Sequence, residues 1–252
     1  MEEASLRARL AGRVLITGAG GGLGTGLADA MLAGGERHLL FHCRRRKDDL
    51  RALLEKYGID PARHLFEADL THEREVQQMH AAIAALHGPL FGLVNLAGSS
   101  SNGMSWKLSV DEFREVLDAN LLTTFLCCRE FAPELREAGR GRIINVSSVV
   151  AFSGAPGTAH YAAAKAAIVG FTRTLALELA PKNVVASTIA LGYFSTGLIE
   201  TIPAPQREHI RARIPAQRFG AARELAGLLH YLLGPNGEFS GGQVHHLNGG
   251  LI

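Results

Sequence analysis

The 252-residue chain has few of the features that would assign it to a secreted or membrane-bound class. Its three cysteines, Cys43, Cys127 and Cys128, are an odd number without a C-x-x-C spacing, so they provide neither a disulfide framework nor a zinc site. No stretch approaches the roughly 20 apolar residues that a membrane-spanning helix requires. The start, MEEASLRARLAG, has no apolar core of a secretory signal. We therefore expect a cytoplasmic protein without a membrane segment.

An excess of charge is also lacking. The chain has 26 basic and 24 acidic residues and a net charge of +2, whereas a general nucleic-acid binder normally has a clear basic excess. Its 11 histidines include no H-E-x-x-H spacing. The adjacent pair His245 and His246 would point to opposite faces of a strand, which makes a poor metal site. We predict neither a nucleic-acid partner nor a bound metal.

Short apolar runs alternate with helical patterns along the whole chain. The runs predict strands at 13–17, 38–42, 64–68, 92–96, 142–147, 184–189 and 243–247, and the patterns predict helices at 23–33, 47–57, 71–87, 110–135, 161–180 and 223–233. Continuous apolar strands that alternate with helices are typical of a parallel sheet covered on both faces. The sequence therefore predicts an α/β fold, in which residues 1–252 form one doubly wound Rossmann-type domain of about seven strands. The segment 191–220 has three prolines and no strand pattern, and we interpret it as a lid.

A glycine-rich turn follows the first predicted strand. Residues 17–24 read TGAGGGLG, which fits T-G-x-x-x-G-x-G, and a helical pattern follows. Glycines in such a turn let the backbone approach a pyrophosphate, whose charge lies against N–H groups at the helix start. The turn predicts a dinucleotide site, although a glycine-rich turn without a ligand is an alternative at this point.

A tyrosine and a lysine occur at helical spacing further along the chain. Tyr161 and Lys165 are four residues apart, so they share one face of the predicted helix. A free tyrosine has a pKa near ~10 and is a poor acid at neutral pH, but a nearby cation lowers that pKa. Ser148 lies 13 residues upstream, at the C-terminal edge of the strand predicted at 142–147, where such sheets bind ligands. Ser147 is the competing hydroxyl, and the spacing to Tyr161 favours Ser148.

These elements occur in an order that resembles the short-chain dehydrogenase/reductase family over nearly the whole chain. The matching motifs are Thr17–Gly24, D-L-T at 69–71, N-x-A-G at 95–98, Asn120, Ser148, Tyr161 with Lys165, L-G-Y-F-S-T at 191–196 and S-G-G-Q-V-H-H-L-N-G-G at 240–250. Three positions depart from the family pattern: Leu96 replaces Asn, Leu191 replaces Pro and Ser187 replaces Asn. These departures affect residues around the site and the geometry of a loop. They leave the four catalytic candidates unchanged, which are Asn120, Ser148, Tyr161 and Lys165.

The resemblance implies a role for each matching residue. Tyr161 would donate a proton, Ser148 would hold the carbonyl oxygen, Lys165 would lower the Tyr161 pKa, and Asn120 would anchor a water chain. The implied cofactor contacts are Thr17, Gly18, Gly22, Leu23, Gly24, Arg44, Arg45, Asp69, Leu70, Asn95, Ala97, Gly98, Tyr161, Lys165, Gly192 and Thr196. The implied substrate contacts are Ser148, Tyr161, Phe152 and Tyr193.

The stretch HCRRRKDD at 42–49 predicts which dinucleotide binds. In NAD-preferring relatives the residue that ends the second strand is acidic and repels a 2′-phosphate. Here that residue is Cys43, and Arg44 follows, with a guanidinium that suits a phosphate in charge and geometry. We predict NADP(H), with Arg44 as the main contact and Arg45 as a second one.

Within the family, the sequence between 141 and 181 and the ends IPAQRFG and SGGQVHHLNGG resemble bacterial 3-oxoacyl-(acyl-carrier-protein) reductases. The resemblance implies NADPH-dependent reduction of a 3-oxoacyl thioester in fatty-acid or polyketide-type biosynthesis. It also implies an acyl carrier protein that meets Arg136, Arg140 and Lys182. A reductase or dehydrogenase of a free alcohol, sugar or ketone is the alternative, and an NADP-sensing regulator without turnover is a third. The helices predicted at 110–135 and 161–180 are apolar, and the family forms dimers and tetramers through them. The resemblance therefore implies a homotetramer, with a dimer as the alternative.

Overall fold

The computed structural model describes residues 12–252, so most of the start that the sequence predicts to lack a secretory signal lies outside the described residues. Seven parallel strands form one sheet in the order β3-β2-β1-β4-β5-β6-β7. They are β1 (Val14–Thr17), β2 (Leu39–Cys43), β3 (Leu65–Glu67), β4 (Gly92–Asn95), β5 (Gly141–Ser148), β6 (Val184–Leu191) and β7 (Val244–Leu247). The strand order changes direction between β1 and β4, and ligands bind beyond the strand ends at such a point.

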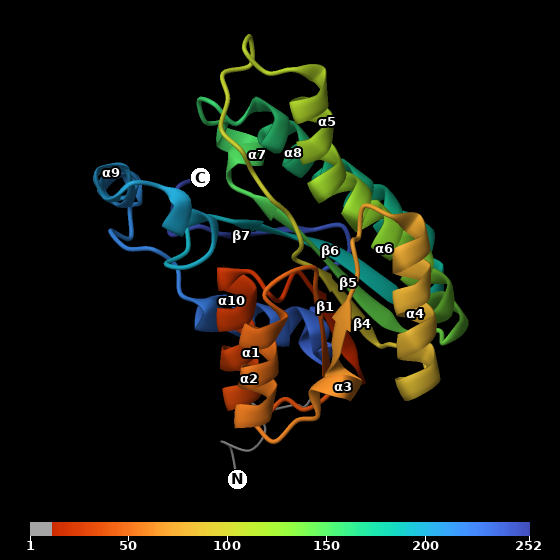
Figure 1. Cartoon of the computed structure of the whole chain (residues 1–252). Coiled ribbons are helices and arrows are strands. Elements are labelled where there is room, and N and C mark those ends of the chain that lie inside the picture. Colours follow the sequence, from red (N-terminus) through yellow and green to blue (C-terminus); the bar gives the residue numbers. More distant parts are fainter. Residues whose placement is uncertain (1–11) are drawn as a thin grey trace.

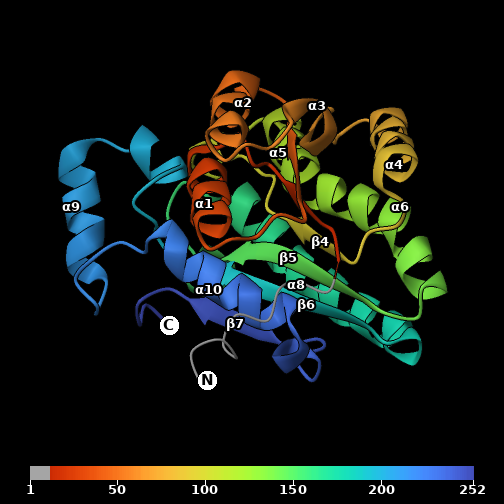
Figure 2. The ribbon, with the colours of Figure 1, turned by 90° about the horizontal axis from the view of Figure 1, so that it is seen from below.

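Helices cover both faces of this sheet, as Figures 1 and 2 show. One face carries α1 (Gly22–Ala33), α2 (Lys47–Lys56) and α10 (Ala222–Leu233), and the other carries α4 (Glu73–His87), α6 (Thr123–Glu137) and α8 (Ala159–Leu179). Successive strand residues point to opposite faces. In β1, Val14 and Ile16 therefore join the core under α1, while Leu15 joins the core under α4. The predicted doubly wound α/β fold is confirmed.

The helix predicted over 110–135 is interrupted. It begins as α5 (Val110–Leu117), passes through a π-helical turn at Asp118–Leu122 and continues as α6. The Asn120 side chain lies in the middle of this turn and donates to the Val116 carbonyl at 2.8 Å, in addition to the backbone bonds. This wider turn places Asn120 near the end of β4. The apolar pattern of the sequence gives no sign of the π-helical turn.

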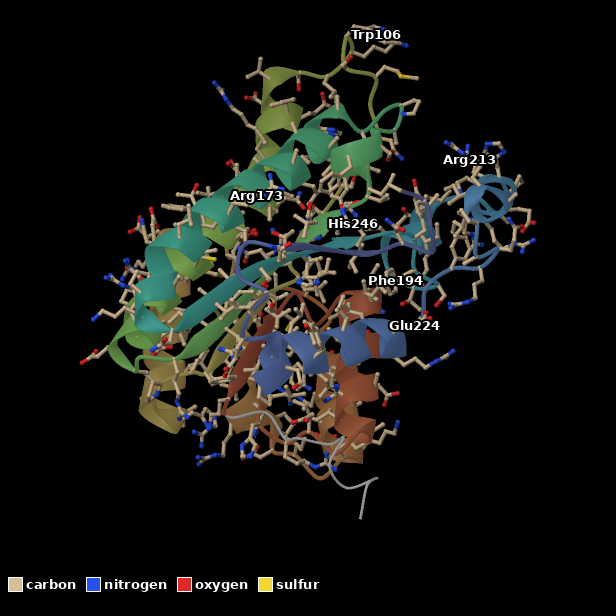
Figure 3. The ribbon with its side chains drawn as sticks, turned by 180° about the vertical axis from the view of Figure 1, so that it is seen from behind. Trp106, Arg173, Phe194, Arg213, Glu224 and His246 are labelled. Carbon is tan, nitrogen blue, oxygen red and sulfur yellow. The ribbon has the colours of Figure 1, made fainter. Side chains whose placement is uncertain are left out.

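Short elements are the other difference from the sequence prediction. The structure adds α3 (Pro61–His64), α7 (Val150–Ser153) and α9 (Ala204–Arg213), and also 3₁₀ turns at Ala180–Lys182, Leu198–Thr201 and Pro235–Gly237. The single turns are too short for a periodic pattern to develop, and α9, although ten residues long, buries none of them and so has no apolar face. Helix α9 belongs to the segment 191–220 and stands apart from the two helical layers (Figures 1 and 3). None of the helices in residues 12–252 is both long enough and apolar enough to cross a membrane.

Candidate active site

A cleft of about 980 Å³ lies at the carboxyl ends of the strands, where the strand order changes. It runs from the glycine turn after β1 and the end of β2, past the ends of β4 and β5, to the segment after β6. Tyr161 and Lys165 on α8 line it, as do Gln206, Ile210 and Arg213 on α9. The elements that sequence motifs place far apart in the chain therefore meet around one cleft.

The glycine turn is held against the end of β4. Gly18 has φ +71°, in the left-handed region, and a Cβ there would lie 2.6 Å from the Ala97 Cα. The Thr17 hydroxyl accepts hydrogen bonds from the Leu96 and Ala97 amides at 3.1 and 3.2 Å. Thr17 is fully buried and does not line the cleft. Its position explains why a threonine precedes the first glycine: it ties the turn to the neighbouring strand.

Two serines end β5, and their hydroxyls are used differently. The Ser147 hydroxyl donates to the Lys165 carbonyl at 2.7 Å, which fixes it to the backbone of α8. The Ser148 hydroxyl accepts a 3.4 Å hydrogen bond from the Val150 amide and is a hydrogen-bond partner of Tyr161. Ser148 is therefore the hydroxyl that faces the tyrosine in the cleft, as the spacing favours.

Tyr161 and Lys165 lie together, but the pKa of Tyr161 is not lowered as expected. Burial raises the pKa of Tyr161 to about 12, and the hydrogen bond with Ser148 opposes this rise. The Lys165 Nζ donates to the Val146 carbonyl at 3.0 Å and lies 5.6 Å from the centre of the Tyr161 ring. Burial lowers the pKa of Lys165 to about 8. The expected lowering of the Tyr161 pKa is therefore not found: desolvation is the largest effect on the phenol, and the Lys165 cation beside the ring is not among the groups that oppose it.

Asn120 is buried beside these groups. Its Nδ2 donates to the Ser99 and Val116 carbonyls at 2.7 and 2.8 Å, whereas its buried Oδ1 has no hydrogen-bond partner in residues 12–252. A Cβ on Gly98 would collide with that Oδ1 and lie 3.3 Å from the Lys165 Nζ. A free acceptor in the interior is costly unless it is used. Gly98 thus leaves room for an acceptor and an ammonium to face the cleft together.

Replacing Gly98 with alanine is expected to lower the free energy of unfolding by about 1–3 kcal/mol, the usual cost of overpacking. Urea denaturation measures the change. Gly227→Ala is the matched control, because a Cβ on this α10 glycine meets no atom within 4 Å, and alanine should add about 0.5–1 kcal/mol there. Equal effects of the two substitutions would contradict the packing described for Gly98.

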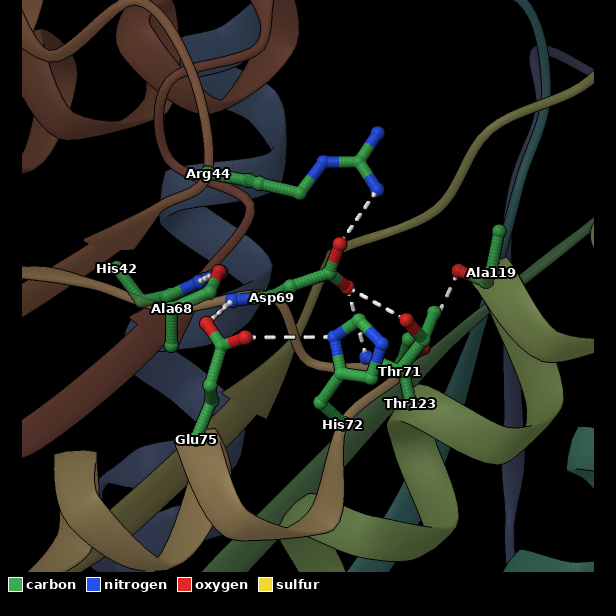
Figure 4. A network of polar contacts seen from close by, with 9 residues as sticks. All are labelled: His42, Arg44, Ala68, Asp69, Thr71, His72, Glu75, Ala119 and Thr123. Carbon is green, nitrogen blue, oxygen red and sulfur yellow. Dashed lines mark hydrogen bonds and ion pairs between the residues drawn. The ribbon is translucent and has the colours of Figure 1, made fainter.

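Arg44 lies at the other end of the cleft, in the polar cluster of Figure 4. Its guanidinium pairs with the Asp69 carboxylate at 3.2 Å and is half exposed. Asp69 also accepts hydrogen bonds from the Thr71 hydroxyl and amide at 2.6 and 3.0 Å. Burial alone would raise the pKa of Asp69, but these hydrogen bonds and the positive charge of Arg44 hold that pKa below its usual value. The cationic rim is therefore preformed, with Arg44 held by one carboxylate and open on its other side.

Most predicted site residues meet at this cleft. Those that line it are Gly18, Gly22, Leu23, Gly24, Arg44, Arg45, Asp69, Leu70, Ala97, Gly98, Asn120, Ser148, Tyr161, Lys165, Gly192, Tyr193 and Thr196. Asn95, like Thr17, lies beneath the lining, where its Nδ2 donates to the Asn145 Oδ1 at 2.8 Å. Phe152 also lies outside the lining: its ring packs edge-on against His246, with 4.8 Å between ring centres. Neither strand spacing nor motif reveals which way the Phe152 ring on α7 turns.

The three basic residues predicted to contact an acyl carrier protein do not lie at the cleft. Arg140 and Lys182 precede β5 and β6, and Arg136 is in the last turn of α6, whereas Ser148 ends β5. A strand of eight residues spans roughly 25 Å. These basic residues therefore lie at the opposite edge of the sheet from the cleft of the same chain. The basic residues at the cleft that the predicted site did not include are Arg46, next to Arg45, and Arg213 on α9 (Figure 3).

Within the described part of the chain, no group of three His, Cys, Asp or Glu side chains is placed to hold a metal ion. The cleft instead fits a dinucleotide. At its start, a Cβ on Gly20 would lie 2.6 Å from the Arg45 carbonyl, and one on Gly22 would lie 2.7 Å from the Gly197 amide. The glycines thus form a cradle that side chains would fill, at the amino end of α1, where N–H groups favour an anion.

Comparison with known proteins agrees with this geometry. The sequence model of the short chain dehydrogenase family matches residues 12–207. The chain is 36% identical to nodulation protein G of Rhizobium sp. (strain N33), over 95% of this chain and 96% of that protein. It is 31% identical to 3-oxoacyl-(acyl-carrier-protein) reductase FabG of Aquifex aeolicus, over 97% and 99%, and 34% identical to acetoacetyl-CoA reductase of Acinetobacter sp. (strain RA3849), over 94% and 96%.

Proposed function

The chain belongs to the short-chain dehydrogenase family of oxidoreductases, and on this premise we propose that it is an NADPH-dependent reductase of a 3-oxoacyl thioester. The observation that carries the proposal is the meeting of Ser148, Tyr161, Lys165 and Asn120 in one cleft. A carbonyl group becomes negatively charged at oxygen when it is reduced, so the site must offer a hydrogen bond and a proton there. The two hydroxyls supply both.

The residues that would hold the dinucleotide follow from the cradle. Gly18, Gly22 and Gly24 would carry the pyrophosphate at the start of α1, Arg44 would bind the 2′-phosphate, and Lys165 would bind the nicotinamide ribose. When bound, the reduced nicotinamide supplies a hydride to the carbonyl carbon. A 2′-phosphate fits the Arg44 side of the cleft because the end of β2 is Cys43, which brings no negative charge.

The protein's own groups complete the reaction at the carbonyl oxygen. The Ser148 hydroxyl donates a hydrogen bond to this oxygen, and the Tyr161 hydroxyl transfers its proton to it. With a pKa of about 12, Tyr161 holds its proton at neutral pH and gives it up only as hydride addition turns the carbonyl oxygen into a more strongly basic alkoxide. The Lys165 ammonium stabilises the phenolate that remains. The Asn120 Oδ1, which has no hydrogen-bond partner among residues 12–252, would bind a water on the path that returns the proton.

Reduction is expected to slow as the pH rises through about 8. Burial lowers the pKa of Lys165 from its usual value to about 8, so the group is an ammonium below this pH and a neutral amine above it. The phenolate would then lose its cation. Ketone reduction followed from pH 6 to 10 measures the decline, and in Lys165→Arg the decline should vanish, because a guanidinium stays charged. A flat profile in the unmodified protein would contradict this role of Lys165.

Two observations favour a thioester over a free ketone. The relatives include proteins named for 3-oxoacyl-(acyl-carrier-protein) and acetoacetyl-CoA reduction. In addition, Arg213 lines the cleft on the same face of α9 as Gln206 and Ile210. A guanidinium at this position suits the phosphate of a pantetheine arm. An acyl carrier protein, which presents such an arm, is the partner that we propose.

Turnover of matched substrates tests the proposal. NADPH and NADH oxidation would be followed with an acetoacetyl thioester of an acyl carrier protein, acetoacetyl-CoA, acetoacetyl-N-acetylcysteamine (which lacks the phosphate) and a panel of free ketones and sugars. We expect turnover of the thioesters with NADPH. Turnover of a free ketone alone would replace this proposal with the alternative, a reductase of free carbonyl compounds.

We propose a homotetramer as the assembled form. Helices α5, α6 and α8 present apolar side chains to solvent, with Val110 64%, Phe125 38% and Leu177 79% exposed. Apolar helix surface of this kind is normally covered by a partner. Light scattering in solution should give four times the mass of one chain, and Leu177→Glu should reduce the assembled mass. A monomer at micromolar concentration would contradict the proposal.

A further inference from the structure

His42 is a buried histidine in the middle of the cofactor-binding half, and no family motif includes it. It is 2% exposed and lies on β2. The Gly18 amide donates to its Nδ1 at 3.2 Å, and its Nε2 lies 2.9 Å from the Ala68 carbonyl oxygen. An amide only donates and a carbonyl only accepts. The contacts therefore require one form of the ring: neutral, with the proton on Nε2 and a lone pair on Nδ1.

The histidine holds the glycine turn through its backbone as well. The Ala19 amide donates to the His42 carbonyl at 2.9 Å, so two successive N–H groups of the turn end on one residue. Gly18 itself has φ +71°. The bonds to His42 satisfy the two amides that this left-handed conformation turns toward β2. They fix the path by which the chain reaches the start of α1.

The other ring nitrogen reaches the segment that follows β3, at the same end of the cleft. Ala68 immediately precedes Asp69, whose carboxylate accepts from Arg44 and Thr71 (Figure 4). One imidazole thus bridges the turn proposed for the pyrophosphate and the segment that positions the Arg44 guanidinium. These segments are about 50 residues apart in the sequence, and they follow β1 and β3, which lie on either side of β2 in the sheet.

The charges around His42 leave the neutral ring in place. Burial lowers its pKa and is the largest effect, and the nearby Arg44 charge lowers it further. The Ala68 carbonyl and the Asp69 carboxylate act in the opposite direction. Because burial dominates, the lone pair on Nδ1 stays available to the Gly18 amide.

We propose that His42 is a positioning residue for dinucleotide binding, which holds the Gly18–Gly21 turn against the Ala68–Asp69 segment through its two ring nitrogens. The inference rests on the proposed function, since it assumes that a dinucleotide occupies this end of the cleft. It adds a requirement that family motifs do not contain. Binding of the dinucleotide at the turn would depend on a hydrogen-bond acceptor that β2 supplies to the Gly18 amide.

Two conservative substitutions separate the two ring contacts. The Oδ1 of asparagine occupies the place of Nδ1, so His42→Asn keeps an acceptor for Gly18 and gives up the Ala68 contact. The amide of glutamine reaches the place of Nε2, so His42→Gln keeps a donor for Ala68 and leaves the Gly18 amide buried without a partner. Loss of a buried hydrogen bond of this kind corresponds to a change of roughly tenfold in an equilibrium.

The test is NADPH affinity, measured by fluorescence titration of the full chain and its variants, together with kcat at saturating NADPH. We expect His42→Gln to raise the NADPH Kd about tenfold and His42→Asn by less than about threefold, with kcat unchanged in both. A role in folding alone would lower the unfolding midpoint without this difference in Kd between the variants, and that result would overturn the inference. Equal Kd values in all three proteins would overturn it too, while the proposed function would stand. A wild-type chain that binds neither NADPH nor NADH would overturn both.

Discussion

Replacing Tyr161 with phenylalanine is expected to lower kcat for thioester reduction by about 10²–10⁴-fold, the range that one general acid contributes. The substitution removes a single oxygen. Phenylalanine preserves the ring that packs beside Lys165, so the fold and the cleft should be unchanged. The loss would then be in the chemical step, with NADPH affinity retained. Stopped-flow turnover and NADPH titration measure these two quantities separately.

The adjacent serines of β5 provide a matched control for this experiment. Ser148→Ala should lower kcat by about 10²–10³-fold, as removal of one hydrogen-bond donor to a developing oxyanion does. Ser147→Ala removes a hydroxyl that donates to the Lys165 carbonyl, and should cost only about 1 kcal/mol of stability. Full turnover in Tyr161→Phe, or equal losses of turnover in the two serine variants, would show that the reacting groups are assigned wrongly.

Replacing Arg44 with aspartate is expected to reverse the preference between the two dinucleotides. The change removes a guanidinium from the proposed 2′-phosphate site and places a carboxylate there, which repels the phosphate. Charge-assisted hydrogen bonds contribute about 1.5–3 kcal/mol, so NADPH affinity should fall by roughly 10- to 100-fold. NADH, which lacks the phosphate, should lose little. The ratio of kcat/KM for the two dinucleotides is the measurement.

A second arginine separates this effect from a general change of charge. Arg51 is exposed on α2 and does not line the cleft, so Arg51→Asp makes the same change in charge away from the site. It should leave the NADPH preference as it was. Arg44→Asp also breaks the ion pair with Asp69, and therefore Arg44→Ser is a useful companion: it should weaken NADPH binding without adding repulsion. An unchanged preference in Arg44→Asp would refute the role of Arg44.

The family and the layout of the sheet could be predicted from sequence because they rest on local patterns. A strand reads as an apolar run and a helix as a 3.6-residue period, and the glycine turn lies between one of each. All seven predicted strands overlap the observed ones. The ends of elements were less predictable, as the π-helical turn at Asp118–Leu122 illustrates, because an extra residue in one turn leaves the apolar pattern almost unaltered.

The amino-acid sequence by itself determined the doubly wound fold, the glycine turn and the i, i+4 pair of Tyr161 and Lys165, since each depends on neighbours along the chain. Only the tertiary structure decided how these groups are solvated. Burial raises the pKa of Tyr161 and lowers that of Lys165, and it leaves the Asn120 Oδ1 without a partner in the described residues. The role inferred for His42 arises in the same way. Burial and long-range hydrogen bonds depend on which distant segments pack together, and no local spacing contains that information.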